Sequence, residues 1–199
     1  MRADAAGASR VAGLVLAAGA ARRFGGRKQL APLDGRPLLE HALAAMAGAG
    51  LTRVAVTLGA HADEIVAAID LHGAQAVVVA DWDEGLAASL RAGVAALAPH
   101  ADAIVVTLGD QPRISSAAIA RVAAVAAEAG GAPAARATYD GRPGHPILLR
   151  RELFPAIAEL RGDSGARELL ATVDVRAVEC GTGTAVDVDT PEQLRGLGG

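Results

Sequence analysis

Short apolar runs alternate with segments of helical pattern through the first 130 residues, and this alternation limits the possible fold more than any other feature. We expect buried strands at residues 11–18, 53–58, 75–80 and 103–108, separated by helices at residues 37–47, 61–69, 86–97 and 115–128. Strands that alternate with helices form βαβ units, in which the strands run parallel and the helices cover both faces of the sheet. The sequence therefore predicts an α/β protein with three layers, helix, sheet and helix, and a mostly parallel sheet.

The alternation ends after residue 130. We expect a strand at 134–139, a polar loop at 140–146, an apolar run at 147–149, helical stretches at 152–160 and 164–171, strands near 176–179 and 185–188, and a short helix that starts beside Pro191. No linker or internal repeat separates this part from the first. We therefore expect residues 11–199 to form a single domain and residues 1–10 to be a flexible N-terminus.

The composition excludes several classes of protein. Hydrophobic residues make up 52% of the chain and aromatic residues 2%, so Ala, Val and Leu must build the core. The net charge of −3 argues against a surface that coats nucleic acid. The single cysteine, Cys180, excludes an internal disulfide and a zinc site built from Cys ligands. Residues 1–10 lack the apolar segment of a signal peptide and no apolar run is long enough to span a membrane, so we expect a cytoplasmic protein with no membrane or nucleic-acid partner.

The first apolar run leads into a loop of small and cationic residues, Gly19 to Lys28. This loop contains three glycines and four cations: Arg22, Arg23, Arg27 and Lys28. Open α/β sheets bind ligands at the carboxyl ends of their strands, and glycine backbone beside Arg and Lys suits a polyphosphate. The loop matches neither G-x-G-x-x-G nor the P-loop pattern, because Gln29 stands where a P-loop has Ser or Thr. The alternative interpretation is a Gly/Ala-rich turn with solvated arginines.

Three segments, in order along the chain, resemble a known family. Leu16–Lys28 matches L-A-A-G-x-x-x-R-F-G-x-x-K, Leu108–Pro112 has the sequence LGDQP, and Asp187–Glu192 has the sequence DVDTPE. This set resembles the MobA-like/MocA-like NTP transferases, of the molybdenum cofactor cytidylyltransferase type. The resemblance implies a Rossmann-like nucleotidyltransferase fold, with residues 11–130 as the nucleotide-binding part and residues 131–199 as the acceptor-binding and metal-binding part.

Three aspartates are candidate metal ligands. Asp110 follows the strand at 103–108, near the expected phosphates, and Mg²⁺ takes one or two carboxylates together with substrate phosphates. Asp187 and Asp189 lie two residues apart, so on a strand both point to one face and to one metal ion. The resemblance supports Asp110 and Asp189 as Mg²⁺ ligands, with Asp187 as the third. The alternatives are a simple turn at Asp110 and an N-cap at Asp189 for the last helix.

The resemblance also assigns the remaining site residues. Arg23 and Lys28 hold the triphosphate and, with Asp110, form the catalytic set. The base and ribose contact Gly85, Ser89 and the backbone of the strand end, which comprises Leu16, Ala17, Ala18 and Gly19. A phosphate of a pterin acceptor contacts three residues of the second part, Arg142, His145 and Arg167. We expect His145 to lie in a loop, between Gly144 and Pro146.

These assignments predict a Mg²⁺-dependent nucleotidyltransferase that moves CMP from CTP to the phosphate of molybdopterin and releases pyrophosphate. Ala17-Ala18 and Lys28-Gln29 favour CTP, because guanylyltransferases of the group tend to have L-A-G-G and an Asp-Lys pair there. The expected partners are CTP or GTP, molybdopterin, and a molybdoenzyme or its maturation chaperone. Three alternatives stay open: a GTP-using molybdenum cofactor guanylyltransferase, a cytidylyltransferase for a sugar or polyol phosphate, and a non-catalytic protein that binds the molybdenum cofactor. The missing G-x-G-x-x-G disfavours a nicotinamide dehydrogenase.

Overall fold

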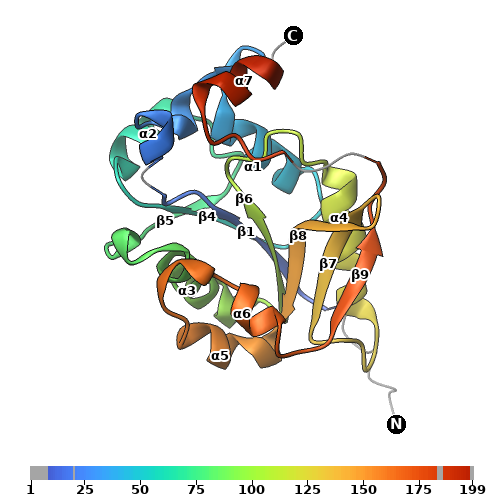
Figure 1. The fold of residues 1–199 in the computed structure, drawn as a ribbon. Helices are drawn as coiled ribbons and strands as arrows, with labels where there is room; N and C mark the ends of the chain where they lie inside the picture. The colour runs from blue at the N-terminus through green and yellow to red at the C-terminus, as the bar shows by residue number, and fades with distance from the viewer. Residues whose placement is uncertain (1–8, 20, 183–185, 198–199) are drawn as a thin grey trace.

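The computed structural model describes residues 9–19, 21–182 and 186–197, and a mixed sheet of seven strands forms the centre of this described part (Figure 1). The strand order is β5-β4-β1-β6-β8-β7-β9. The strands are β1 Val11–Leu16, β4 Val54–Leu58, β5 Gln75–Val78, β6 Ala103–Leu108, β7 Ala134–Tyr139, β8 Arg142–Arg150 and β9 Val175–Glu179. A separate antiparallel pair consists of β2 Pro32–Leu33 and β3 Arg36–Pro37. The predicted α/β class with a mostly parallel sheet is confirmed.

The parallel pairing of β1 brings two of the predicted segments together. Leu16 at the end of β1 lies opposite Thr57 on β4 and Leu108 on β6. Beyond the strands, the Gly109 N–H donates a hydrogen bond to the Leu16 carbonyl at 2.9 Å. The loop that begins at Ala17 and the LGDQP segment therefore lie side by side, at the carboxyl edge of the sheet.

Strand β8 corrects one prediction. The predicted polar loop at 140–146 is wrong from residue 142 onward, because residues 142–150 form one strand that pairs antiparallel with β6 and β7. Two prolines and a glycine, in the sequence RPGHP, conceal the strand pattern, and the pairing with β7 shifts register between Arg136 and Thr138. Such an irregularity tolerates proline within a sheet. His145 consequently lies in a strand inside the sheet and not in a loop.

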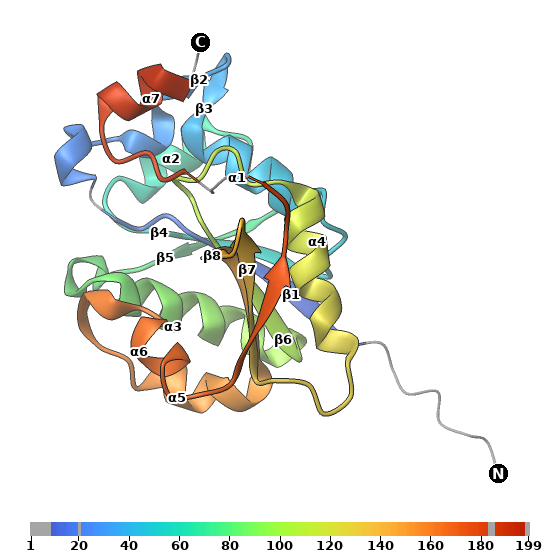
Figure 2. The same cartoon turned by 45° about the vertical axis from the view of Figure 1, so that its right-hand side comes forward.

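Helices cover both faces of the sheet, as predicted (Figure 1, Figure 2). One face is covered by α1 Leu38–Ala47, α2 Ala62–Ala68 and α4 Ser116–Ala124. The other is covered by α3 Leu86–Leu97, α5 Phe154–Ala158 and α6 Arg167–Leu170. The last helix, α7 Pro191–Leu197, packs beside the start of α1 at the carboxyl edge.

The core between these layers is aliphatic, as the composition requires. Leu14 of β1, for example, is fully buried against α3. A Cβ at Gly93 of α3 would collide with the Leu14 side chain, so this glycine lets the helix lie close to the strand. No helix in the described part of the chain is long and apolar enough to cross a membrane.

The C-terminal elements are shorter than predicted. The predicted helix at 164–171 is a 3₁₀ turn, Gly162–Ser164, followed by α6, and Gly165 at φ +52° separates the two. The predicted helix at 152–160 is likewise a 3₁₀ turn followed by α5. The predicted strand at 185–188 is wrong for residues 186–188, which have no regular structure, and residues 183–185 lie outside the described residues. Residues 1–8 of the predicted flexible N-terminus lie outside them as well.

Candidate active site

A cavity of about 520 Å³ lies at the carboxyl ends of β1 and β6 and extends to the first turns of α3. Its volume falls within the range of about 300–1,000 Å³ that is usual for small-molecule sites. Every residue predicted to hold the nucleotide lines this cavity: Leu16, Ala17, Ala18, Gly19, Arg23, Lys28, Gly85, Ser89 and Asp110. The fold therefore gathers at one place residues that are as far apart as Leu16 and Asp110 in the sequence.

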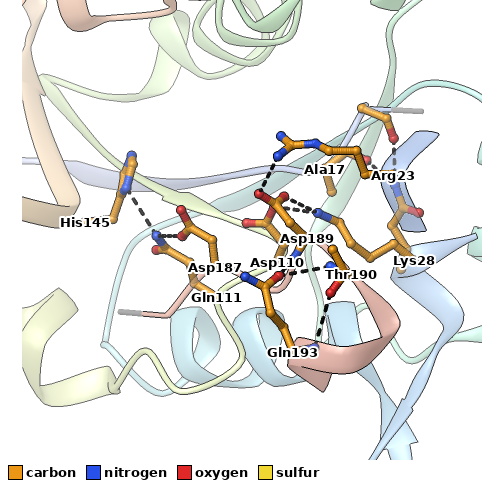
Figure 3. A network of polar contacts seen from close by, with 12 residues as sticks. Ala17, Arg23, Lys28, Asp110, Gln111, His145, Asp187, Asp189, Thr190 and Gln193 are labelled. Carbon is orange, nitrogen blue, oxygen red and sulfur yellow. Dashed lines mark hydrogen bonds and ion pairs between the residues drawn. The ribbon is translucent and has the colours of Figure 1, made fainter. Parts of the chain in front are cut away.

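Lys28 connects two of the predicted carboxylates (Figure 3). Its Nζ lies 2.7 Å from Asp110 Oδ2 and 3.6 Å from Asp189 Oδ1, and the Arg23 guanidinium lies 3.3 Å from Asp189 Oδ2. The Lys28 side chain is 14% exposed, whereas that of Arg23 is 78% exposed. Solvent therefore screens the Lys28 pairs less than the Arg23 pair. Two cations and two carboxylates meet at the cavity.

Asp187 has a different partner. Gln111 Nε2 donates to Asp187 Oδ1 at 2.6 Å and lies 3.5 Å from His145 Nδ1 (Figure 3). Between the two aspartates, the Val188 N–H donates to the Asp110 carbonyl at 2.9 Å, and the Val188 side chain is fully buried. This backbone bond, in place of a strand ladder, holds the segment against the LGDQP loop.

Asp189 does not cap α7, so the alternative interpretation of Asp189 as an N-cap is wrong. Thr190 Oγ1 accepts from the Gln193 N–H at 3.3 Å, and Gln193 Oε1 accepts from the backbone N–H groups of Asp189 and Thr190 at 2.6 and 3.0 Å (Figure 3). Thr190 and Gln193 thus form a capping box for α7. The Asp189 carboxylate is left to face Lys28 and Arg23.

The carboxylates of Asp110 and Asp189 have the chemistry of a divalent-cation site. Asp110 Oδ1 is buried and has no hydrogen-bond partner among the described residues, and oxygens of both aspartates approach one cation, Lys28 Nζ. Mg²⁺ and Mn²⁺ favour such oxygens and take further ligands from substrate phosphates. No group of three or more His, Cys, Asp or Glu side chains in the described part could hold a metal ion. A metal ion held by Asp110 and Asp189 would take its remaining ligands from substrate phosphates and water.

Gln29, which follows the basic loop, and Arg27, which belongs to it, have different partners. Gln29 is buried, and its Nε2 donates to the carbonyls of Ala17 at 2.8 Å and Gly19 at 3.2 Å, which holds the loop around the cavity. Arg27 has a left-handed backbone, φ +45°, and its guanidinium lies 3.2 Å from Glu64 on α2. Arg27 does not line the cavity.

Arg91 of α3 fixes the wall that contains Trp82. Its guanidinium donates to both Glu84 carboxylate oxygens at 2.6 and 3.0 Å, to Asp81 Oδ2 at 2.9 Å and to the Leu160 carbonyl at 2.7 Å. Hydrogen bonding to Arg91 holds the pKa of Glu84 below its usual value. Trp82, which lies between the two acidic residues in the chain, lines the cavity.

Gly85 allows a close approach at the start of α3. Its backbone has φ +118°, and a Cβ there would collide with the Asp163 carboxylate. Asp163 itself lines the cavity. The glycine thus brings the 3₁₀ turn Gly162–Ser164 up to the cavity wall.

The three residues predicted to contact the acceptor do not all lie together. His145 and Arg167 line a second cavity of about 110 Å³, whereas Arg142 is exposed at the β7–β8 turn and lines neither cavity. Burial, and then the nearby Arg136, lower the pKa of His145 to about 4, so its ring is neutral at pH 7. The Tyr139 hydroxyl donates to the His145 carbonyl at 2.8 Å, and burial raises the pKa of Tyr139 to about 12.

The sequence pattern of the MobA-like NTP transferase domain matches residues 13–178. The chain belongs to the MobA-like NTP transferase family. It is 37% identical over 193 residues to the nicotine blue oxidoreductase of Paenarthrobacter nicotinovorans, covering 92% of this chain and 94% of that protein. It is 32% identical over 198 residues to the purine catabolism protein PucB of Bacillus subtilis (strain 168), covering 91% and 92%.

Among solved structures, the fold is similar to that of Rv0371c from Mycobacterium tuberculosis H37Rv, with a TM-score of 0.88, 35% identity and coverage of 96% of this chain and 98% of that chain. A manganese complex of Rv0371c matches with a TM-score of 0.83 and 33% identity, over the same shares of the two chains. As a MobA-like NTP transferase, the protein is a nucleotidyltransferase, and the family implies an NTP substrate.

Sequence reasoning missed several polar residues of this MobA-like site. Gln29 holds the loop through a hydrogen bond to Ala17, and Gln111 holds Asp187. Two further residues, Asp83 and Asp163, line the cavity. One signal was present, since Gln29 and Gln111 each directly follow a predicted charged ligand in the sequence. The contacts of Gln111 and Asp163 join segments far apart in the chain, which no local pattern records.

Proposed function

We propose that this MobA-like NTP transferase moves CMP from CTP to the phosphate of molybdopterin and releases pyrophosphate. The observation that supports this proposal most is the Lys28–Asp110 pair, at 2.7 Å, on the wall of a nucleotide-sized cavity. The choice of CTP and of molybdopterin rests on the resemblance of the LAAG, LGDQP and DVDTPE segments to the cytidylyltransferase type.

In the proposed reaction, the side chains bind and orient, and none forms a covalent bond to substrate. Lys28 and Arg23 neutralise the triphosphate while the backbone of residues 16–19 faces the base and ribose. An oxygen of the acceptor phosphate attacks the α-phosphorus in line, and a new P–O bond forms. The bond from the α-phosphorus to the bridging oxygen breaks, and pyrophosphate leaves with the electron pair. Positioning and charge stabilisation lower the barrier.

Asp110 and Asp189 would hold a divalent cation, Mg²⁺ or Mn²⁺, with Asp187 nearby on the same segment. A cation bound there supplies positive charge against the phosphates. Lys28 contacts both carboxylates. A cation held by Asp110 would compete with Lys28 for this carboxylate, and the Lys28 ammonium would then be available to the triphosphate.

Pyrophosphate release tests the proposal directly. The protein is incubated with Mg²⁺ or Mn²⁺ and with CTP, GTP, ATP or UTP, each with and without molybdopterin. We expect release from CTP that requires molybdopterin. Preference for GTP would indicate the guanylyltransferase, and release with a sugar or polyol phosphate as acceptor would indicate the other cytidylyltransferase.

Nucleotide binding is measured separately, because Trp82 is the sole tryptophan of the sequence and lines the cavity. If CTP quenches this fluorescence but no acceptor gives turnover, the result would favour the non-catalytic binding protein. Oxidation of NAD(P)H by the protein, with no pyrophosphate release, would favour a redox activity, the class that the name of the Paenarthrobacter nicotinovorans relative states for that protein.

Asp110→Asn tests the metal site. We expect turnover to fall at least about 100-fold, because the variant loses the carboxylate charge that holds the cation, while the circular dichroism spectrum stays unchanged. Asp63→Asn, on an exposed position of α2, is the matched control and keeps wild-type turnover. Full Mg²⁺-dependent activity in Asp110→Asn would remove Asp110 from the mechanism.

A further inference from the structure

The second cavity, of about 110 Å³, contains positive charge without acidic compensation. Arg136 and Arg167 line it together with His145, and the other described residues of its lining are Leu, Ile, Val and Ala. Neither arginine forms a hydrogen bond or ion pair through its side chain within the described part of the chain. The wild-type sequence therefore places two unpaired cations against an apolar surface.

Arg136 occupies a position where the fold otherwise places aliphatic side chains. It lies on β7 opposite Ile147, and both Ile147 and Ala134, two residues before Arg136, belong to the buried cluster under α3 and α5. Its Nε atom is buried and lacks a partner among the described residues. Burial, and then repulsion by Arg167, lower the pKa of Arg136. An unpaired donor on a half-buried cation costs free energy, so Arg136 is suited to an anionic ligand that would satisfy it.

The second cavity adjoins the nucleotide cavity. Leu16, Leu86 and Leu108 line both. The two cavities are also connected through polar side chains. His145 Nδ1, in the second cavity, lies 3.5 Å from Nε2 of Gln111, the residue next to Asp110. A group bound in the second cavity would therefore lie next to the nucleotide cavity. The volume lies well below the about 300–1,000 Å³ of a site for a whole ligand, so the cavity accepts one end of a larger molecule.

We propose that the second cavity is an oxyanion subsite for the acceptor, in which Arg136 and Arg167 bind a phosphate or carboxylate whose short apolar stem lies against the leucines. The inference rests on the proposed function in one respect, namely that the bound group belongs to the acceptor. Arg136 is thereby a binding residue in addition to His145 and Arg167.

The test measures anion binding to the protein without nucleotide or acceptor. Ethylphosphonate and propionate serve as probes, because they share a two-carbon stem and differ in the oxyanion, and potassium chloride keeps the ionic strength constant. Binding is followed by the NMR signals of the His145 ring, which lines the cavity. We expect saturable shifts with at least one probe, and the probe that binds more tightly identifies the oxyanion.

Arg136→Met and Arg167→Met are the test variants, and Arg53→Met is the control. Arg53 is exposed before β4, at the opposite edge of the sheet. We expect Arg136→Met to weaken probe binding at least tenfold, Arg167→Met to weaken it less because this side chain is exposed, and Arg53→Met to leave it unchanged. Equal binding in Arg136→Met and wild type, or no saturable shift in wild type, would overturn the proposal.

Thermal unfolding separates a binding role from a structural one. Without ligand, Arg136→Met is expected to melt at or above the wild-type temperature, because it replaces a half-buried unpaired cation with an apolar side chain. A clearly lower melting temperature would assign Arg136 to structure and count against the subsite. Should Arg136→Met not fold, the loss of probe binding in Arg167→Met decides the question.

The inference and the proposed function fail separately. If probe binding depends on Arg136 but molybdopterin gives no pyrophosphate release, the subsite proposal stands and molybdopterin is not the acceptor. Pyrophosphate release whose acceptor KM is the same in Arg136→Met and wild type would keep the function and reject the subsite. If both proposals hold, Arg136→Met raises the acceptor KM and leaves the KM for CTP unchanged.

Discussion

The two adjoining cavities differ in how their positive charges are balanced. In the larger one, Lys28 and Arg23 form ion pairs with Asp110 and Asp189, whereas in the smaller one Arg136 and Arg167 have no acidic partner among the described residues. A site with internal ion pairs must exchange partners when a ligand binds, while a site with unpaired cations attracts an anion directly. The larger cavity therefore suits a polyphosphate that arrives with a metal ion, and the smaller one suits a lone oxyanion.

The largest expected effect tests the paired cavity. Lys28→Met removes the cation that we propose to hold the triphosphate, so we expect kcat/KM for CTP to fall by about 100-fold, a typical loss for one charge-stabilising group in an active site. Arg27→Met is the matched control from the same loop, because Arg27 pairs with Glu64 and does not line the cavity. We expect it to change kcat/KM by less than about twofold. Similar losses in both variants would mean that the loop acts only through its overall charge.

A smaller effect tests the wall next to both cavities. Arg91 holds Glu84 and the Leu160 carbonyl, and the α3 residue Leu86 lines both cavities. Arg91→Met frees the Trp82 segment, so we expect the Kd for CTP, measured by Trp82 fluorescence, to rise by about fivefold, equivalent to about 1 kcal/mol. Arg10→Met breaks an exposed pair with Asp102 near the starts of β1 and β6 and should leave this Kd unchanged. An unchanged Kd in Arg91→Met would show that the wall keeps its position without this clamp.

The smallest effect tests the charge environment of the second cavity through pH. The pKa of His145 is lowered to about 4 from an ordinary 6.5, so between these values the unfolded chain binds a proton that the folded protein does not. Stability is therefore complete above pH 6.5 and falls as the pH drops towards 4, by at most about 1.4 kcal/mol per pH unit from this residue. Thermal or urea unfolding measures the stability at each pH. Between pH 6.5 and 4, the stability of His145→Gln should fall less steeply than that of wild type.

The same experiment sharpens the comparison of the cavities. An oxyanion beside His145 favours the protonated ring, so a probe bound in the second cavity should reduce the acid loss of wild type but not of His145→Gln. Identical pH profiles of the two proteins, with and without the probe, would contradict both the lowered pKa of His145 and its closeness to the oxyanion.

Much of the fold and of the larger cavity could be predicted because it follows from local patterns and one topological rule. Apolar runs that alternate with helical segments indicate parallel strands, and parallel strands bring their carboxyl ends to one edge. The loop Gly19 to Lys28 and the LGDQP segment therefore had to meet, as Lys28 and Asp110 do. The roles of the residues predicted to contact the nucleotide came from the resemblance to the MobA-like family, and this rule explains why most of them meet at one edge.

The second part of the chain was harder to predict because its contacts join distant segments. The prolines of RPGHP suggested a loop, but residues 142–150 find strand partners on both sides, β6 and β7. Gln111 and Asp187, 76 residues apart, form a hydrogen bond that no local sequence pattern indicates. Thr190 rather than Asp189 caps α7, although the capping box Thr190 to Gln193 is visible in the sequence.

The sequence by itself determined the parallel strands of the first 130 residues, the glycine-rich basic loop and the position of Asp110 at the carboxyl edge. Hydrophobic periodicity and the alternation of strands with helices depend on neighbours in the chain, so the parallel strands of the first 130 residues can be derived from the sequence. Only the tertiary structure decided that Arg27 pairs with Glu64 outside the cavity, that Gln29 is buried and that Arg136 lines the second cavity. The direction of a side chain on a strand or loop depends on which distant segments pack against it, because a shift of one residue in pairing moves it to the other face.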